Sequence, residues 1–202
     1  FFLLLSILGW VVWRGVEQMD YRWQWYRVPA FFFREIDGEI IWGPLTYGLQ
    51  VTLYAAAWGM VLTLLIGLTT AILRLSESIS GRAVARGYVE IIRNTPLLVQ
   101  VSIFYFVLQP ILGINNPLWT GILCLAFFEG SFASEIIRAS INSVARGQWE
   151  AARTVGLDKR RTYTNVILPQ AIPPMIPPLA NYLITMFKET PLLAAITVVE
   201  LF

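Results

Sequence analysis

Two acidic residues stand in an otherwise apolar segment of this sequence and are its first candidates for chemistry. Glu129 and Glu135 are the charged residues within positions 118–137, and Arg138 follows directly. If this segment crosses a bilayer from its outer end, a rise of about 1.5 Å per residue puts Glu129 roughly 17 Å deep and Glu135 roughly 26 Å deep. An acid near mid-bilayer costs about 2.5–3.5 kcal/mol, so Glu129 is expected to face a cavity or a partner charge.

The two acids are expected to have different roles. Arg138 follows Glu135 by three residues, and an i,i+3 pair of opposite charges is an ordinary structural ion pair on a helix. Glu129 has no charged neighbour one turn away, because those positions are apolar: Leu125, Ala126, Phe132 and Ala133. Two interpretations stay open. Glu129 faces a transport pathway and binds the cationic part of a substrate, which is our hypothesis, or it pairs with a basic residue of another subunit.

Several kinds of chemistry are excluded by residue types that the sequence lacks. It contains no histidine and a single cysteine, Cys124, so it offers neither a histidine-dependent triad nor a structural zinc or disulfide framework. No GxxxxGK[ST] phosphate-binding loop occurs. A net charge of +2 is too small to indicate nucleic acid as a partner. We therefore expect no enzyme activity, no metal and no cofactor on this chain.

The composition is that of a membrane protein. Hydrophobic residues make up 56% of the 202 residues, charged residues make up 14%, and the mean hydropathy is +0.61. Residues 40–73 contain no charged residue, whereas about 20 apolar residues suffice to cross a bilayer. The apolar runs lack the period-2 alternation of a transmembrane β-barrel. The predicted fold class is therefore all-α: a polytopic membrane protein in contact with membrane lipid.

Apolar segments predict about five transmembrane helices in a single domain of residues 1–202. The segments are residues 1–13, 45–73, 95–114, 118–137 and 166–187. The first is short and lacks an initiator methionine; a cleaved signal core is the alternative, but we expect a span whose start is missing. Residues 1–44 then form the first span and an outside loop, and residues 45–202 form the core.

Loop charges predict the orientation, because cytoplasmic loops carry an excess of Lys and Arg. Residues 14–39 carry four Arg against five acids, which indicates an outside loop. Residues 74–93 carry four Arg against two acids, and residues 138–161 carry six basic residues against two acids. Both of these loops are therefore predicted to be cytoplasmic, and the chain is predicted to begin inside the cell.

Two of the spans have unusual residue patterns. The second carries small residues at every fourth position, which predicts a ridge for close helix packing: Ala55, Gly59, Thr63, Gly67 and Ala71. The fifth is rich in prolines, each of which removes a backbone donor: Pro169, Pro173, Pro174, Pro177 and Pro178. We expect a broken helix that lines the pathway, with Pro173, Pro177 and Asn181 as substrate-path candidates. A kinked packing helix is the alternative.

A short charged helix is predicted between the last two spans, over residues 148–155. Its apolar face contains Trp149, Ala152 and Val155. Gly156 can take the left-handed conformation that ends a helix. Ala151 and Ala152 present almost no side chain, so a partner's groove could close around the backbone. An amphipathic helix on the lipid surface, helped by the basic residues 159–161, is the alternative.

The spacing of this segment resembles the EAA loop of ABC-importer permeases, the element that docks into the ATPase subunit. Glu150-Ala151-Ala152 is followed after three residues by Gly156, and later by Leu168-Pro169. Further segments are similar to polar amino acid permeases of the histidine/glutamine type: EIIRNTPLLVQ at 90–100, SEIIR at 134–138, LPQA at 168–171 and KETPLL at 188–193. Together these matches cover roughly residues 45–202.

The resemblance implies the permease subunit of an ATP-driven importer in the bacterial inner membrane. ATP and Mg²⁺ would then bind to a partner chain. The implied partners are a second permease subunit, identical or homologous, two ATP-binding subunits and a substrate-binding protein. The EAA loop implies an ATPase-coupling role for Gln148, Glu150, Ala151, Ala152 and Gly156.

Two departures from the family affect what the resemblance implies. Pro191 stands where the family usually has Ser, as in some compatible-solute permeases, so an ectoine-like zwitterion is an alternative substrate. The family also has a span after the segment that corresponds to Val198–Leu201, and we expect that span to be missing from this sequence. Outside the family, an ion-coupled transporter or channel is the alternative, although neither calls for an EAA helix.

Overall fold

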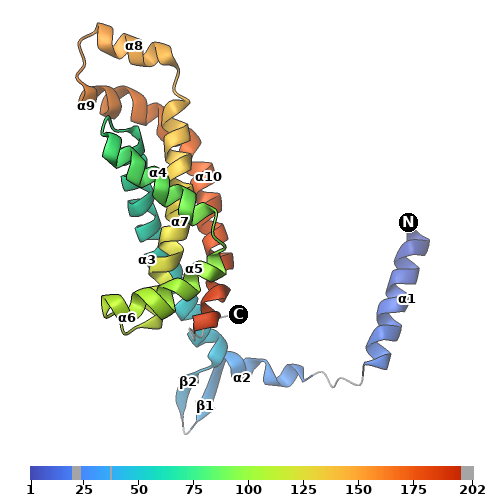
Figure 1. The fold of residues 1–202 in the computed structure, drawn as a ribbon. Coiled ribbons are helices and arrows are strands. Elements are labelled where there is room, and N and C mark those ends of the chain that lie inside the picture. The colour runs from blue at the N-terminus through green and yellow to red at the C-terminus, as the bar shows by residue number, and fades with distance from the viewer. Residues whose placement is uncertain (20–23, 37, 197–202) are drawn as a thin grey trace. The chain divides into compact units, whose positions relative to one another are not determined.

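The computed structural model describes residues 1–19, 24–36 and 38–196, so the segment Val198–Leu201 lies outside the described residues. By its internal contacts the chain divides into two compact units, Phe1–Pro44 and Leu45–Phe202 (Figure 1). The boundary falls at the start of the long helix α3 (Pro44–Leu75).

The first unit contains a β-hairpin, so the prediction of an all-α fold is wrong for this part of the chain. Strands β1 (Phe33–Ile36) and β2 (Glu39–Trp42) pair antiparallel, with Phe33 opposite Trp42. Gly38 has a φ of +81°, the left-handed conformation of a tight turn. The physical reason is local, because aromatic and β-branched residues on both sides of an Asp-Gly pair favour a hairpin. The other elements are α1 (Phe2–Gln18), a 3₁₀ turn at Trp25–Arg27 and α2 (Pro29–Phe32).

The second unit contains helices and no strand among its described residues. Its long helices are α3, α7 (Pro117–Asn142) and α10 (Leu168–Glu189). The shorter elements are α4 (Ile79–Arg93), α5 (Leu97–Ile103), a π-helical stretch at Phe104–Leu108, α6 (Gln109–Leu112), α8 (Arg146–Thr154), α9 (Lys159–Thr162), a π-helical stretch at Tyr163–Ile167 and a 3₁₀-helical segment at Thr190–Ile196. Helices α8 and α9 lie at one end of this unit, and α5 and α6 lie toward the other (Figure 1).

Two of the described helices, α3 and α7, are long and apolar enough to cross a membrane. A third span results if α4 is counted together with residues Leu97–Leu112, although the chain bends by 110° between them. The bend lies beside Pro96, whose ψ of 138° is extended and whose ring disfavours helical backbone in the preceding residue. The described residues thus form a mostly helical membrane protein with two or three candidate spans.

The small residues of α3 form a buried ridge, which confirms the packing predicted from their spacing. Every one of them is buried: Ala55, Gly59, Thr63, Gly67 and Ala71. A Cβ atom on Gly59 would collide with Met186 Cε of α10, and one on Gly67 would lie 2.8 Å from the Cβ of Ala133 in α7. Helix α3 therefore packs against α7 and α10 with no room for a larger side chain.

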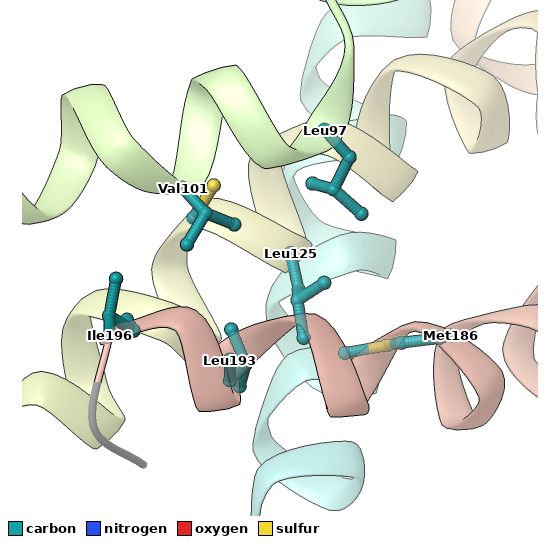
Figure 2. Packing of buried hydrophobic residues seen from close by; sticks show 7 residues of the cluster. Leu97, Val101, Leu125, Met186, Leu193 and Ile196 are labelled. Carbon is teal, nitrogen blue, oxygen red and sulfur yellow. The ribbon is translucent and has the colours of Figure 1, made fainter.

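Two apolar clusters connect the helices of the second unit. One joins α5, α7, α10 and the segment after α10 (Figure 2): Leu97, Val101, Cys124, Leu125, Met186, Leu193 and Ile196. The other joins α3, α7 and α10 near the end that carries α8: Ala71, Ile137, Ile141, Ile167, Ala171 and Met175. Because lipid is as apolar as these side chains, close packing rather than escape from water holds such clusters together.

Helix α10 is continuous, so the predicted break in the fifth span is wrong. The prolines inside it are Pro173, Pro174, Pro177 and Pro178. A proline ring fixes φ near the helical value and withholds a single N–H, so each one removes only the bond to the carbonyl four residues earlier. The spacing of four also places the prolines on one side of the helix. A distortion precedes Pro169 instead, as the π-helical stretch Tyr163–Ile167.

Gly67→Ala should destabilise the protein, although alanine favours a helix over glycine by about 1 kcal/mol. The added methyl group would lie 2.8 Å from Ala133 Cβ and 3.3 Å from the carbonyl oxygen of Gly130, so α3 would have to move away from α7. Gly87→Ala in α4 is the matched control, because a methyl group there meets no atom within 4 Å. Thermal unfolding in detergent should show a lower midpoint for Gly67→Ala alone. Equal midpoints for Gly67→Ala and the wild type would contradict the close packing of α3.

Candidate functional site

Helix α8, which carries the predicted coupling residues, is a nine-residue helix with a well-defined end. Gly156 follows it with a φ of +76°, the left-handed conformation expected from the sequence. The Gly156 N–H donates to the Arg153 carbonyl and the Leu157 N–H to the Ala152 carbonyl, each at 3.0 Å. These bonds satisfy carbonyl groups that a helix end otherwise leaves open. The length of α8 is therefore set by its own backbone.

One face of α8 is attached to the rest of the second unit. The Trp149 ring packs edge-on against Tyr163, with ring centroids 5.2 Å apart. Ala152 is only 3% exposed. At the start of α10, Gln170 Nε2 donates a hydrogen bond of 3.2 Å to Gln148 Oε1. Helix α8 is therefore in direct contact with α10 and with the stretch that precedes it.

The opposite face of α8 is open. Glu150, Ala151 and Gly156 are exposed. Val155 is 73% exposed, although its spacing placed it on the same face as Ala152. The reason is that Val155 has left helical geometry, with φ −84° and ψ 9°, and turns outward. Because Ala152 lies against the body of the unit, the backbone is accessible to a partner at the exposed residues with little or no side chain, Gly147, Ala151 and Gly156.

An ion pair connects the turn after α3 to the segment after α8. Lys159 Nζ lies 2.7 Å from Glu77 Oε1. The hydrogen bond and charge of Lys159 lower the pKa of Glu77, and those of Glu77 raise the pKa of Lys159. A cavity of about 440 Å³ lies beside this pair and under α8, with Leu75 and Trp149 in its wall. Since both charged side chains are exposed, the pair is open to screening by salt.

Glu135 is the centre of a cluster of charges. Arg138 Nη2 lies 2.7 Å from Glu135 Oε2, in the i,i+3 pair expected from the sequence. Arg74 at the end of α3 pairs with the other carboxylate oxygen, and Arg93 Nη1 of α4 lies 3.9 Å from the same oxygen. Glu135 therefore links three helices rather than stabilising one.

Glu129 is buried within the second unit and is only 1% exposed. Its carboxyl group is within hydrogen-bonding reach of Glu189 at the end of α10. The Oε2 atom of each acid has no hydrogen-bond partner among the described residues. Two carboxylates in contact repel each other unless a proton or a cation lies between them. The pair can therefore hold a proton or a cationic group.

The other predicted substrate-path residues lie on a different surface. Pro173, Pro177 and Asn181 are exposed and recur at intervals of four, which puts them on one side of α10. Glu129 lies in the interior and faces Glu189 instead. Within the described part of the chain, the four path candidates are not brought together.

The fold supplies partners that sequence reasoning missed. Arg74 is 61 residues from Glu135, and Glu77 is 82 residues from Lys159, so no local pattern relates them. A signal did exist for Glu189. An unpaired acid inside a span needs a partner, and Glu189 follows the fifth apolar segment in the sequence directly after Lys188.

The described residues offer no obvious place for a metal ion. Among residues 1–19, 24–36 and 38–196, no group of three or more His, Cys, Asp or Glu side chains comes together. Cys124 is a free thiol buried in α7. The chemistry of the described sites is therefore that of charges, hydrogen bonds and packing.

Comparison with known proteins relates the chain to a transport family. The family described as binding-protein-dependent transport system inner membrane component matches residues 63–202. The chain is 40% identical over 175 residues to the L-cystine transport system permease protein TcyB of Bacillus subtilis (strain 168), covering 87% of this chain and 73% of that protein. It is 37% identical over 155 residues to the putative glutamine transport system permease protein GlnP of Rickettsia prowazekii (strain Madrid E), covering 76% and 71%.

Solved structures agree with the sequence relatives. A crystal structure of an amino acid ABC transporter with histidines matches with a TM-score of 0.71 and 35% identity, covering 78% of this chain and 74% of that one. The MetNI methionine ABC transporter in an inward-facing conformation matches in fold, with a TM-score of 0.63 at 21% identity, covering 78% and 76%. The chain therefore belongs to the binding-protein-dependent transport system inner membrane components, the multi-pass permeases of bacterial ABC transporters.

Proposed function

We propose that this chain is the permease subunit of an ATP-driven importer of a polar amino acid, and that α8 couples it to the ATPase. The observation that carries the proposal is the two-sided character of α8. Its inner face is attached to Tyr163 and α10, and its outer face leaves Ala151 and Gly156 accessible. The sequence has no phosphate-binding loop of its own, so ATP hydrolysis belongs to a partner chain.

The coupling would work by displacement of α8. Closure of the ATPase subunits pushes on the outer face of α8, and the contacts of Trp149 and Gln148 pass the displacement to Tyr163 and α10. The spans then rock as rigid bodies and expose the pathway alternately to the two sides of the membrane. To reverse the pathway from 1:99 to 99:1, the coupling must supply about 5.5 kcal/mol.

The proposed assembly has a second permease subunit, identical or homologous, two ATP-binding subunits on the α8 side and a substrate-binding protein on the other side. About five spans per permease would be needed, with α1 and α10 joining the two or three candidates found by length and composition. Pro173, Pro177 and Asn181 form an exposed face of α10, and we assign this face to the substrate path between the two permease subunits.

The proposed substrate is an α-amino acid. Relatives are named for L-cystine and glutamine transport, and the similar crystal structure is of an amino acid transporter with histidines. These compounds share an ammonium group next to a carboxylate. Glu129, with Glu189 beside it, would accept the cationic part once α10 has moved relative to α7. An ectoine-like zwitterion is the second candidate, on the observation that Pro191 replaces the usual Ser.

Gly156→Arg should uncouple the transporter. An arginine at a φ of +76° is strained, and its side chain would fill the space next to Ala151 that a partner needs. Co-expressed with its ATPase and binding protein, the variant should still insert, but uptake and stimulated ATP hydrolysis should fall at least about tenfold, the effect of roughly 1.4 kcal/mol. Gly113→Arg is the control and should be milder, because Gly113 has a similar φ of +67° and open space but follows α6, at the other end of the unit from α8 (Figure 1). Normal uptake by Gly156→Arg, or no co-purification of an ATPase with the wild type, would refute α8 as the docking element.

Charge reversal tests the Glu77–Lys159 pair. Glu77→Lys should lower uptake per ATP hydrolysed by up to about fivefold, the range of an exposed ion pair, and Glu77→Lys combined with Lys159→Glu should restore it. Because the pKa of Glu77 is lowered and that of Lys159 is raised, both groups stay charged around neutral pH. The contribution of the pair is lost as the pH falls through the lowered pKa of Glu77 or rises through the raised pKa of Lys159.

The difference between Glu77→Lys and the wild type should therefore be largest near neutral pH and should shrink in high salt. Uptake assays at several pH values and salt concentrations measure this. No rescue by the double reversal would show that the pair has no part in coupling.

Glu129→Gln tests the proposed pathway role of the buried acid. Removal of the charge should reduce uptake by about tenfold or more, the usual effect of losing a hydrogen bond to a charged group, while the complex still assembles with its ATPase subunits. Uptake into proteoliposomes and gel filtration of the complex separate the two effects. Dissociation of the subunits would instead favour a pair between Glu129 and a basic residue of the second permease, and unchanged uptake would contradict both roles.

A further inference from the structure

A cavity lined mainly by charged residues lies beside α4. Its volume is about 650 Å³, and it is lined by Arg74, Arg86, Val89, Glu90, Arg93, Asn94, Phe132 and Glu135. Small-molecule sites in proteins span roughly 300–1,000 Å³, so the cavity has the size of a ligand site. Its wall combines charged groups with an apolar floor formed by Val89 and Phe132.

Some of the charges in this cavity already have partners. Glu135 is paired with Arg74 on one oxygen and with Arg138, at 2.7 Å, on the other. An acid held by two guanidinium groups has little capacity left for a ligand. Glu135 and Arg74 therefore form a fixed part of the cavity wall, and Arg138 holds Glu135 in place from outside the lining.

Three charged groups of α4 remain available. Arg86 and Glu90 form no ion pair among the described residues, and both are exposed to the cavity side of the helix. Arg93 lies over the Phe132 ring, 4.9 Å from its centroid, and reaches Glu135 only at 3.9 Å. Phe132 thus holds the Arg93 guanidinium in place while leaving its hydrogen-bond donors largely free.

These groups lie within residues 74–93, whose excess of Arg predicts a cytoplasmic location next to the membrane. Helix α4 and residues Leu97–Leu112 together form a candidate span with a bend. Any of these charges that enters the membrane is costly in hydrocarbon and has to face water or a bound partner. The polar side of α4 is accordingly the side on which a polar ligand can be accommodated.

We propose that this cavity binds the zwitterionic head of an α-amino acid, with the guanidinium groups of Arg86 and Arg93 taking the carboxylate and Glu90 taking the ammonium group. The proposal rests on the proposed function and adds a place on the chain where the transported compound is held. A simple anion would leave Glu90 without a partner, and a simple cation would leave the two arginines without one. A ligand that carries both charges side by side satisfies all three groups.

The test uses the assembled transporter in nanodiscs of phosphatidylglycerol, without the binding protein. Binding of L-[³H]glutamine and L-[³⁵S]cystine is measured by scintillation proximity for the wild type, Arg86→Gln and Glu90→Gln. Each substitution should weaken binding of the probe that the complex imports by about tenfold or more, because each removes a charged hydrogen-bonding group. Arg160→Gln is the matched control, since Arg160 is exposed on α9 and does not line the cavity.

A second measurement assigns the ammonium group to Glu90. An analogue of the bound probe that lacks the α-ammonium group should compete only weakly with the labelled probe for the wild-type complex. The Glu90→Gln substitution should not change the affinity of the complex for this analogue. A similar loss of affinity for both compounds in Glu90→Gln would overturn the assignment, because a merely structural role of Glu90 affects both equally.

The outcomes separate this inference from the proposed function. If the complete wild-type system imports neither probe, the amino acid function itself fails. The cavity site alone is wrong if the complete system imports a probe that the nanodisc complex does not bind at millimolar concentration. It is also wrong if the imported probe binds to the Arg86→Gln and Glu90→Gln complexes as tightly as to the wild type. Native mass spectrometry tests for a lipid headgroup as the ligand. If the wild type retains phosphatidylethanolamine, Glu90→Gln does not, and probe binding is unchanged, the ligand is a lipid headgroup and the proposal is overturned.

Discussion

The sites of the second unit depend on how closely α3 approaches α7 and α10. Gly59 and Gly67 have no side chain at the points where Met186 and Ala133 lie against α3. In lipid, helices associate through such close packing, because apolar side chains gain little from leaving an apolar solvent. The approach brings Arg74, in the last turn of α3, to Glu135 of α7. The paired Arg74 and Glu135 form part of the wall of the charged cavity beside α4.

The charges inside the second unit are of two kinds: those that neighbouring charges compensate and those that are left uncompensated. Glu135 is surrounded by guanidinium groups of three helices, so its charge is compensated and it holds those helices together. Glu129 and Glu189 face each other with an unpartnered oxygen on each. A compensated charge resists change, whereas an uncompensated pair responds to a proton or a cation. The proposed transport role of Glu129 relies on a charge of the second kind.

In the proposed mechanism, helix α8 links the ATPase contact to the acid pair. Its inner face contacts Tyr163 in the π-helical stretch and Gln170 at the start of α10, and α10 ends at Glu189 beside Glu129. Because α10 is continuous through its prolines, a displacement at Gln170 can travel along one helix to the acid pair. A broken helix would absorb part of that displacement at the break. The continuity of α10 therefore suits it to transmission between an ATPase contact and a substrate group.

The sequence by itself determined features that depend on near neighbours: the ridge from Ala55 to Ala71, the left-handed end of α8 at Gly156 and the spacing of Glu135 and Arg138. These follow from helical period and backbone preference, which a few residues suffice to express. The hairpin of β1 and β2 had a local signal of the same kind in the Asp-Gly pair of the sequence, but the apolar composition favoured helices throughout. Only the tertiary structure decided that Glu129 meets Glu189, that Arg74 meets Glu135, and that Ala152 faces inward. Partners so distant in sequence become neighbours through helix packing alone, and no local pattern encodes that.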